Sequence, residues 1–380
     1  MPEHQNFFSL DLPADPGAAL SAAAEIAINE SLAVKPGERV LIVTNPDTEV
    51  AAVSMALYNA AAGQGAEPLL MVQPVKTQLD YTDEAVIAAI SSRPEIVISI
   101  SKEKLGKDAR AQRKPYTAGG KSYDSLIHYL RDGEKVVRSF WSPRITRAQF
   151  AELVPLDYAR LKEECRRLCT LLDRGKEVRV TSPGGTDIVL GLQGRKTKVD
   201  DGDFSAPGSG GNLPAGEVFI SPELGSSQGR IAFDGSLATH DGVLVPRRPV
   251  IAEVRDGFVT GITGEAEADT LKRSLKEAAQ RARDMEASGG LPAGQGEIYA
   301  RNAANLGELG IGLNRKAAIV GSILVDEKVY GTCHIAIGAN YDEDAPALIH
   351  LDGLIRNPTI TVLNDAGEAT VLMEAGRLLI

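Results

Sequence analysis

Residues 39–44 read Arg39-Val40-Leu41-Ile42-Val43-Thr44, a short apolar run without polar alternation. Such a run is typical of a strand buried on both faces, as in a parallel sheet. The same pattern returns at residues 68–72 and 96–100, and helical patterns lie between and before these runs, over residues 18–33, 49–62 and 83–89. Strands that alternate with helices predict a parallel α/β fold. We therefore expect an N-terminal parallel α/β domain over residues 1–175.

The pattern changes after a helix expected over residues 156–172. Short strands are expected at 178–181 and 187–190, and more follow, with one long helix over 266–286. Residues 202–216 are rich in Gly, Pro and Ser, so they form either a linker or a loop just before a functional strand. Many strands with few helices predict an α+β domain, which we place at residues 176–380 and expect to bind metal.

The composition is that of a globular protein, with 43% hydrophobic and 24% charged residues among 380. A formal net charge of −10 argues against nucleic acid or an anionic membrane as the main partner. The first 16 residues lack the basic start of a signal peptide, and no apolar run is long enough to span a membrane. Three cysteines, an odd number, fit a reducing compartment. We expect a cytoplasmic protein without a membrane partner.

Imidazole and carboxylate side chains recur on apolar strands of the second domain. In residues 333–338, period-two alternation places two isoleucines on one face and His334 on the other. In residues 349–353, the same alternation places His350 and Asp352 side by side, opposite an isoleucine and a leucine. Each of these residues alone fits an ordinary strand with a solvent-exposed outer face, and only the whole set indicates a functional site.

Two glutamates complete the set. Glu308 lies opposite the apolar face of residues 306–313, and Glu217 begins the apolar run 217–220. A half-buried charge costs several kcal/mol unless it is paired or bound to a metal. Glycines beside Glu308 and His334 leave room for another group to approach. Carboxylates with two histidines are the ligands of a two-metal hydrolytic site, so we predict that all five residues converge in one pocket.

The segments that carry these residues resemble, in the same order, blocks of the thermophilic metallo-aminopeptidase family, the aminopeptidase S / aminopeptidase T group. The similar segments are residues 35–40, 212–219, 306–310, 326–338 and 350–352. The resemblance implies a homodimer in which each chain holds two divalent metal ions (Zn²⁺, Co²⁺ or Mn²⁺). It implies the metal ligands Glu217, Glu308, His334, His350 and Asp352. It also implies that Tyr341 is catalytic, as an oxyanion donor or a further metal ligand.

The activity implied is that of a metallo-aminopeptidase, a hydrolase that cleaves the N-terminal peptide bond of peptides with a water activated by two metals. Residues 326–333 depart from the family's Asp-Glu-Asn-Ala run, which indicates a divergent subgroup and leaves a peptide or another small molecule as substrate. The scaffold also resembles the dihydroxypyridine ring-cleaving dioxygenases, which hold one non-haem iron with two histidines and an acid. In that alternative, His334 or another histidine joins His350 and Asp352. A metal-bearing binding protein without turnover is the third interpretation.

Overall fold

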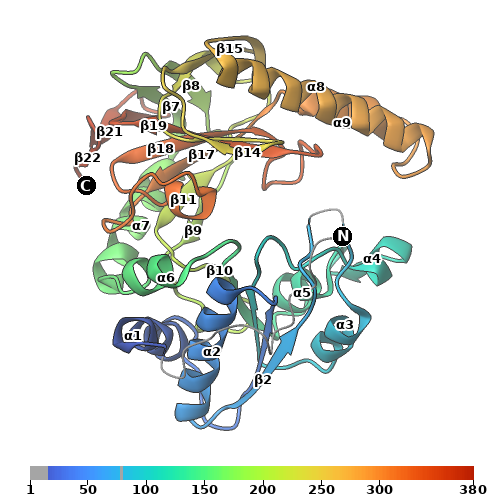
Figure 1. Cartoon of the computed structure of the whole chain (residues 1–380). Coiled ribbons are helices and arrows are strands. Elements are labelled where there is room, and N and C mark those ends of the chain that lie inside the picture. The colour runs from blue at the N-terminus through green and yellow to red at the C-terminus, as the bar shows by residue number, and fades with distance from the viewer. Residues whose placement is uncertain (1–15, 78–79) are drawn as a thin grey trace. The chain divides into compact units, whose positions relative to one another are not determined.

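The structure is a computed structural model that describes residues 16–77 and 80–380. The chain forms two compact units (Figure 1). The first comprises residues up to Asp157 together with Gly202–Ala215, and the second comprises Tyr158–Asp201 and Gly216–Ile380. The expectation that the first 16 residues are no signal peptide concerns residues that, except for Pro16, lie outside the described part. Within the described part, no helix is both long and apolar enough to cross a membrane.

The boundary between the units differs from the one predicted at residue 175. The helix α7 (Tyr158–Leu172) contacts the strands β7 (Gly175–Thr181), β9 (Lys198–Asp200) and β11 (Glu217–Ile220), so it belongs to the second unit. The Gly-rich segment 202–216 is not a simple linker. It returns to the first unit, where β10 (Gly210–Asn212) pairs with β6 (Arg138–Trp141), and it ends directly before β11. Local sequence patterns do not reveal either of these long-range contacts.

The first unit is a parallel α/β sheet, as predicted. Its five strands lie in the order β10-β6-β3-β1-β2, and all neighbouring strands pair in parallel. The other strands of this sheet are β1 (Arg39–Thr44), β2 (Glu67–Val72) and β3 (Ile96–Ile100). The central strands β1 and β3 are buried almost throughout because helices cover both faces, which explains their unbroken apolar sequence.

The helices of the first unit form two groups (Figure 1). One group contains α1 (Ala18–Ile26), α2 (Thr48–Gly63) and α6 (Arg147–Leu153), which contact one another. On the other face, α3 (Glu84–Ser91) and α5 (Leu126–His128) pack on a cluster that includes Leu41 and Val43. The remaining elements are α4 (Ala109–Arg113) and the hairpin of β4 (Tyr116–Ala118) and β5 (Lys121–Tyr123), with π-helical turns at Ala27–Ser31 and Tyr129–Gly133.

The second unit contains two antiparallel sheets, which confirms the α+β expectation. The seven-stranded sheet has the order β14-β13-β19-β18-β17-β11-β9, and the eight-stranded sheet has the order β16-β15-β12-β8-β7-β20-β21-β22. Besides those already given, the first sheet contains β13 (Leu237–Thr239), β14 (Gly242–Leu244), β17 (Leu306–Gly312), β18 (Thr332–Gly338) and β19 (His350–Arg356). The second contains β8 (Asp187–Gly191), β12 (Gln228–Phe233), β15 (Val250–Arg255), β16 (Phe258–Thr263), β20 (Thr359–Asn364), β21 (Ala369–Glu374) and β22 (Arg377–Leu378).

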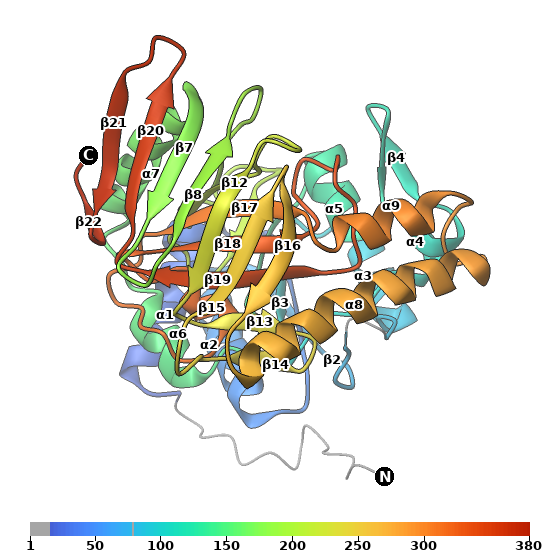
Figure 2. The same ribbon diagram turned by 90° about the horizontal axis from the view of Figure 1, so that it is seen from above.

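The two sheets pack face to face, and the strands of one cross those of the other (Figure 2). The ring of Phe233 on β12 lies where a Cβ of Gly353 on β19 would be, with Cδ1 only 2.2 Å from that position. This contact shows that the face of β19 bearing Leu351 and Gly353 packs against the eight-stranded sheet. Since successive side chains of a strand alternate, His350 and Asp352 project from the opposite face.

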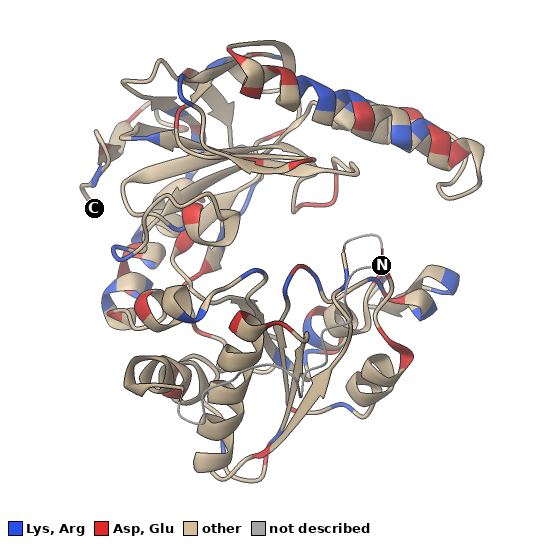
Figure 3. Cartoon of the chain, viewed as in Figure 1, with Lys and Arg blue, Asp and Glu red and all other residues tan. Residues whose placement is uncertain are grey.

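Three helices complete the second unit besides α7: α8 (Ala266–Ala287), α9 (Gln295–Asn302) and α10 (Ile323–Asp326). Lys, Arg, Asp and Glu residues follow one another along α8 (Figure 3). The buried residues of α8, which include Ala268, Leu271 and Ala282, form a stripe on the side of the helix away from the charged residues. The helix contacts β13, β15 and β16. This long helix is therefore an amphipathic surface helix, as its sequence indicates.

The close approach of His334 to Gly310 gives a test of the strand register. A Cβ added at Gly310 would lie 2.0 Å from Nε2 of His334, so Gly310→Ala must displace the imidazole. We expect a lower thermal midpoint, because overpacking of a buried site costs about 1–3 kcal/mol. Gly63→Ala at the end of α2 is the matched control, since an added Cβ there meets no heavy atom within 4 Å. A Gly310→Ala protein as stable as the control would show that this register is wrong.

Candidate metal centre

The five predicted ligands lie on one face of four neighbouring strands, which we call the site face. Glu217 is on β11, Glu308 on β17, His334 on β18, and His350 and Asp352 on β19. The register brings them together across the strands, because His334 lies opposite Gly310, and both Glu308 and Asp352 lie opposite Ala336. Small residues therefore separate the large polar ones. The side chains of Glu217, Glu308 and Asp352 are at most 9% exposed, and that of His334 is fully buried.

The ligand atoms form two groups that share Glu308. Glu217, Glu308 and His334 make the first group, and Glu308, His350 and Asp352 make the second, with the donor atoms of each group within 4.8 Å of one another. In the first group, Nε2 of His334 lies 2.9 Å from Oε1 of Glu308 and 3.5 Å from Oε2 of Glu217. In the second, Nε2 of His350 lies 3.2 Å from Oδ1 of Asp352 and 3.5 Å from Oε2 of Glu308.

The second group fits a metal ion. Ligands bonded at about 2.0–2.2 Å to one ion lie about 2.8–3.6 Å apart for angles between roughly 90° and 110°, which is the range found here. Oε2 of Glu308 and Oδ1 of Asp352 are buried and have no hydrogen-bond partner among the residues that the structure describes. A buried carboxylate oxygen without a hydrogen-bond donor is costly, so a cation at this point would stabilise the carboxylates of both Glu308 and Asp352.

The ring of His350 is already oriented for such an ion. Its Nδ1 lies 2.8 Å from the carbonyl oxygen of Ala339, and because a carbonyl only accepts, Nδ1 carries the donated proton. Nε2 is then the nitrogen that faces the carboxylates and binds metal in the neutral tautomer. Burial favours a low pKa for His350, but the charges of Asp352 and Glu308 raise it to about 10. The side chain of His350 is 23% exposed, so solvent reaches the second group of ligands at His350.

His334 belongs to the first group and orients Glu308, the residue that the two groups share. Its Nε2–H donates to Oε1 of Glu308, and its fully buried ring has no exposed edge. Burial works against the charged imidazolium, yet the hydrogen bond to Glu308 and the charge of Glu217 raise the pKa of His334 to about 9. Burial raises the pKa of Glu308 itself, because charge in a low-dielectric interior is unfavourable. His334 therefore holds one oxygen of Glu308 and leaves the other for the second group.

Sequence reasoning missed two residues that lie beside the first group. Lys328, in the turn after α10, is fully buried, and its Nζ lies 2.5 Å from Oε1 of Glu217 and 3.2 Å from Oδ2 of Asp200. Asp200 lies directly opposite Glu217 in the pairing of β9 with β11. The available signal was the run at residues 326–333, where a lysine interrupts the family's usual pattern. Nothing local indicated Asp200.

Tyr341 adjoins the second group through its ring. The ring centroid of Tyr341 is 5.1 Å from that of His350 and 5.2 Å from that of Phe219, both in edge-to-face geometry. Phe219 follows Glu217 by two residues on β11 and so shares the site face, which the sequence analysis did not note. Tyr341 is 52% exposed. The structure thus places the ring of Tyr341 between those of His350 and Phe219, in contact with both, and a catalytic role for Tyr341 remains a prediction.

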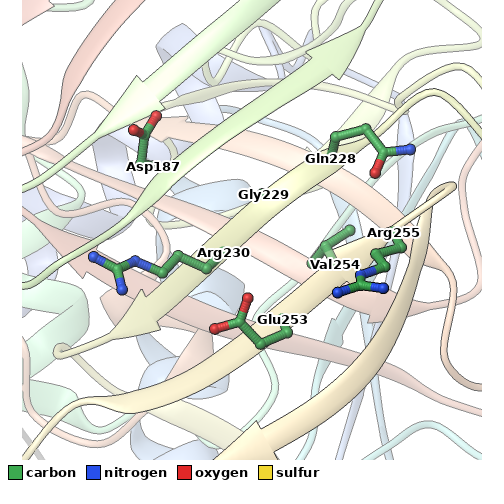
Figure 4. A pocket seen from close by; sticks show the side chains of 7 residues that line it. All are labelled: Asp187, Gln228, Gly229, Arg230, Glu253, Val254 and Arg255. Carbon is green, nitrogen blue, oxygen red and sulfur yellow. The ribbon is translucent and has the colours of Figure 1, made fainter.

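Two further carboxylates of the second unit, Asp326 and Glu253, lie outside the two groups and so offer no general base within them. Asp326 accepts the backbone N–H groups of Val320 and Gly321 and so fixes a turn. Glu253, on β15 of the eight-stranded sheet, lines a surface hollow together with Arg230 and Arg255 (Figure 4). Neither residue belongs to the two metal-binding groups found among the described residues.

The chain is similar to proteins of two kinds. The 2,5-dihydroxypyridine 5,6-dioxygenase of Pseudomonas putida KT2440 is 24% identical over 155 residues, which span 39% of this chain and 40% of that relative. The solved structure of 2,5-dihydroxypyridine dioxygenase from the same organism matches with a TM-score of 0.70 and 17% identity, over 97% of this chain and 98% of the other. AmpT from Thermus thermophilus matches with a TM-score of 0.63 and 18% identity, over 95% and 99%.

At these identities the two solved structures show the fold alone. The likeness to AmpT agrees with the fold implied by the aminopeptidase resemblance, whereas the curated relative favours the dioxygenase alternative over the peptidase. A family model described as 2,5-dihydroxypyridine 5,6-dioxygenase (NicX) matches residues 146–362, which is more than half of the chain and includes all five residues of the site face. This chain therefore belongs to the family described as 2,5-dihydroxypyridine 5,6-dioxygenase.

Proposed function

We propose that the protein is a non-haem iron dioxygenase that opens the ring of a hydroxylated pyridine or a related heteroaromatic compound. The observation that carries this proposal is the group of Glu308, His350 and Asp352, which fits one ion and lies within the residues that match the family model. This set of ligands departs from the expected triad of two histidines and an acid, because His334 lies in the first group and forms a hydrogen bond with Glu308. One imidazole and two carboxylates still suit a divalent iron or manganese ion.

Each residue of the group has a separate task. His350 is held by the carbonyl of Ala339 so that Nε2 faces the ion, and His334 fixes the orientation of Glu308. Asp352 balances the charge, since the neighbouring imidazoles lower its pKa against the effect of burial. When bound, Fe²⁺ would supply the redox chemistry that couples O₂ to the ring. The fixed ligands keep the geometry from changing when substrate enters.

The surroundings of His350 support an aromatic substrate. The ring of Tyr341 lies next to the imidazole and the ring of Phe219 lies next to Tyr341, and flat aromatic compounds pack well against such rings in offset or edge-to-face geometry. Tyr341 is half exposed, so its ring is accessible to a ligand that arrives from solvent. We assign Tyr341 to substrate binding or proton donation at this point of the site face.

The second candidate is a metallo-aminopeptidase with two ions. The specific observation in its favour is that Glu308 has a donor oxygen in both groups, as a carboxylate that bridges two metals does. His334 and Glu217 would then bind the second ion with it, and a water between the ions would attack the peptide carbonyl. The two candidates therefore differ in the number of ions, in the need for O₂ and in the substrate.

Two further expectations remain part of this proposal. A homodimer is implied by the resemblance to the aminopeptidase group, and light scattering at micromolar concentration tests it. A cytoplasmic location agrees with the three cysteines, all of which are unbonded.

An assay separates the two candidates. We expect the Fe²⁺-loaded protein to consume O₂ in a one-to-one ratio with 2,5-dihydroxypyridine or another hydroxylated pyridine, because both atoms of O₂ enter the opened ring. The same preparation should not hydrolyse aminoacyl amides. Oxygen uptake is followed with an electrode and ring loss by ultraviolet absorbance. Hydrolysis of aminoacyl substrates by protein loaded with Zn²⁺, Co²⁺ or Mn²⁺, with no oxygen uptake across a panel of hydroxypyridines, would favour the peptidase.

Neighbouring substitutions on β19 separate metal binding from folding. Asp352→Ala should abolish tight metal binding and turnover while leaving the thermal midpoint nearly unchanged, because it removes a ligand and no apolar packing. Leu351→Asp should lower the midpoint strongly, since it buries an unpaired carboxylate in the layer between the sheets, at a cost of several kcal/mol. Bound metal and thermal unfolding are measured for both. An Asp352→Ala protein with full metal content would show that Asp352 is no ligand.

A further inference from the structure

Lys328 is a fully buried cation of the second unit. The backbone around it is fixed against the segment that follows β17, because the N–H of Asn314 donates to the carbonyl of Lys328. Its Nζ lies 2.5 Å from Oε1 of Glu217, 2.9 Å from Oε1 of Glu327 and 3.2 Å from Oδ2 of Asp200. The ammonium donates hydrogen bonds to Glu217 and Glu327, and Asp200 contacts it as an ion pair. Its position is fixed by charge and not by apolar packing.

The strand register explains why a cation is needed here. Asp200 on β9 and Glu217 on β11 are directly opposite each other, and like charges at such a position are destabilising. Both side chains are buried, so water does not screen them. The ammonium of Lys328 contacts both carboxylates and offsets this repulsion. Burial raises the pKa of Glu217 and that of Asp200, and Lys328 counteracts the shift in both.

The same ammonium borders the first metal-binding group. Glu217 offers Oε1 to Lys328 and only Oε2 to the group that it forms with Glu308 and His334. A divalent ion bound at Oε2 would be one carboxylate away from a fixed positive charge in a low-dielectric interior, where like charges repel strongly. His334 already donates to Oε1 of Glu308, which is the oxygen that the first group would need.

We propose that Lys328 is a built-in cation that takes the place of a second metal ion beside Glu217, so that the centre binds one divalent ion, at Glu308, His350 and Asp352. Lys328 is a positioning residue, since it acts through Glu217 and touches neither the ion nor the substrate. This inference deepens the proposed function and rests on it in taking Glu308, His350 and Asp352 as the iron site. It also explains why Glu217 is present in a centre with a single ion.

The test counts metal ions and does not depend on turnover. Metal-free protein is loaded with Mn²⁺, desalted and analysed by inductively coupled plasma mass spectrometry. We expect one ion per chain for the wild type and also for Glu217→Gln, because Glu217 serves Lys328 and not the ion. Lys328→Met, which removes the charge at similar length, should bind two. A wild type that binds two ions, with Glu217→Gln reducing the number to one, would overturn the proposal, as would a folded Lys328→Met protein that still binds one.

If Lys328→Met does not fold, the comparison of wild type with Glu217→Gln decides alone, since an unchanged count of one supports the proposal and a reduced count overturns it. Asp352→Ala provides the baseline without the proposed ion. The outcome is separate from that of the proposed function. A protein with one ion and no oxygen uptake contradicts the dioxygenase and leaves the role of Lys328 intact. A protein with two ions that consumes O₂ contradicts only the role of Lys328.

Discussion

A row of buried charges of alternating sign crosses four strands of the second unit, and the rest of the site depends on it. The row runs through Lys328, Glu217, His334, Glu308, His350 and Asp352, each within 3.5 Å of the next. An isolated charge is costly in such an interior, and the opposite charge beside each member offsets part of that cost. One buried oxygen each of Glu217, Glu308 and Asp352 still lacks a hydrogen-bond donor among the described residues, and a divalent ion at Glu308 and Asp352 would relieve two of these three.

The sheet makes this row possible through small residues. Gly310 lies under the ring of His334, and Ala336 separates Glu308 from Asp352 on the strand between them. The opposite face of the same strands is apolar and packs against the eight-stranded sheet, with Phe233 lying on Gly353. A shift of one residue in any of these strands would exchange the two faces and place the charges in the apolar layer. Stability and metal binding therefore depend on one register.

Local patterns in the sequence predict much of this arrangement. The unbroken apolar run at Arg39–Thr44 indicated the parallel sheet, because a strand covered on both faces shows no alternation. Period-two alternation placed His334, His350, Asp352 and Glu308 on one face, because side-chain direction in a strand is a local property. What the sequence did not reveal depends on contacts between distant segments. Asp200 is recognisable only once β9 pairs with β11, and the unit boundary only once α7 packs on its strands. The peptidase expectation rests on the family resemblance and on the set of five ligands, and neither indicates that Lys328 forms an ion pair with Glu217.

Anomalous diffraction from crystals of the full chain grown with Mn²⁺ would test the central claim most directly, because it locates each ion independently of any assay. The account predicts a single strong peak bonded to Oε2 of Glu308, Nε2 of His350 and Oδ1 of Asp352, at about 2.0–2.3 Å from each. It predicts no peak between Glu217 and His334, with the ammonium of Lys328 still on Glu217. A second peak of comparable height between Glu217, Glu308 and His334 would contradict the account and establish a two-metal centre.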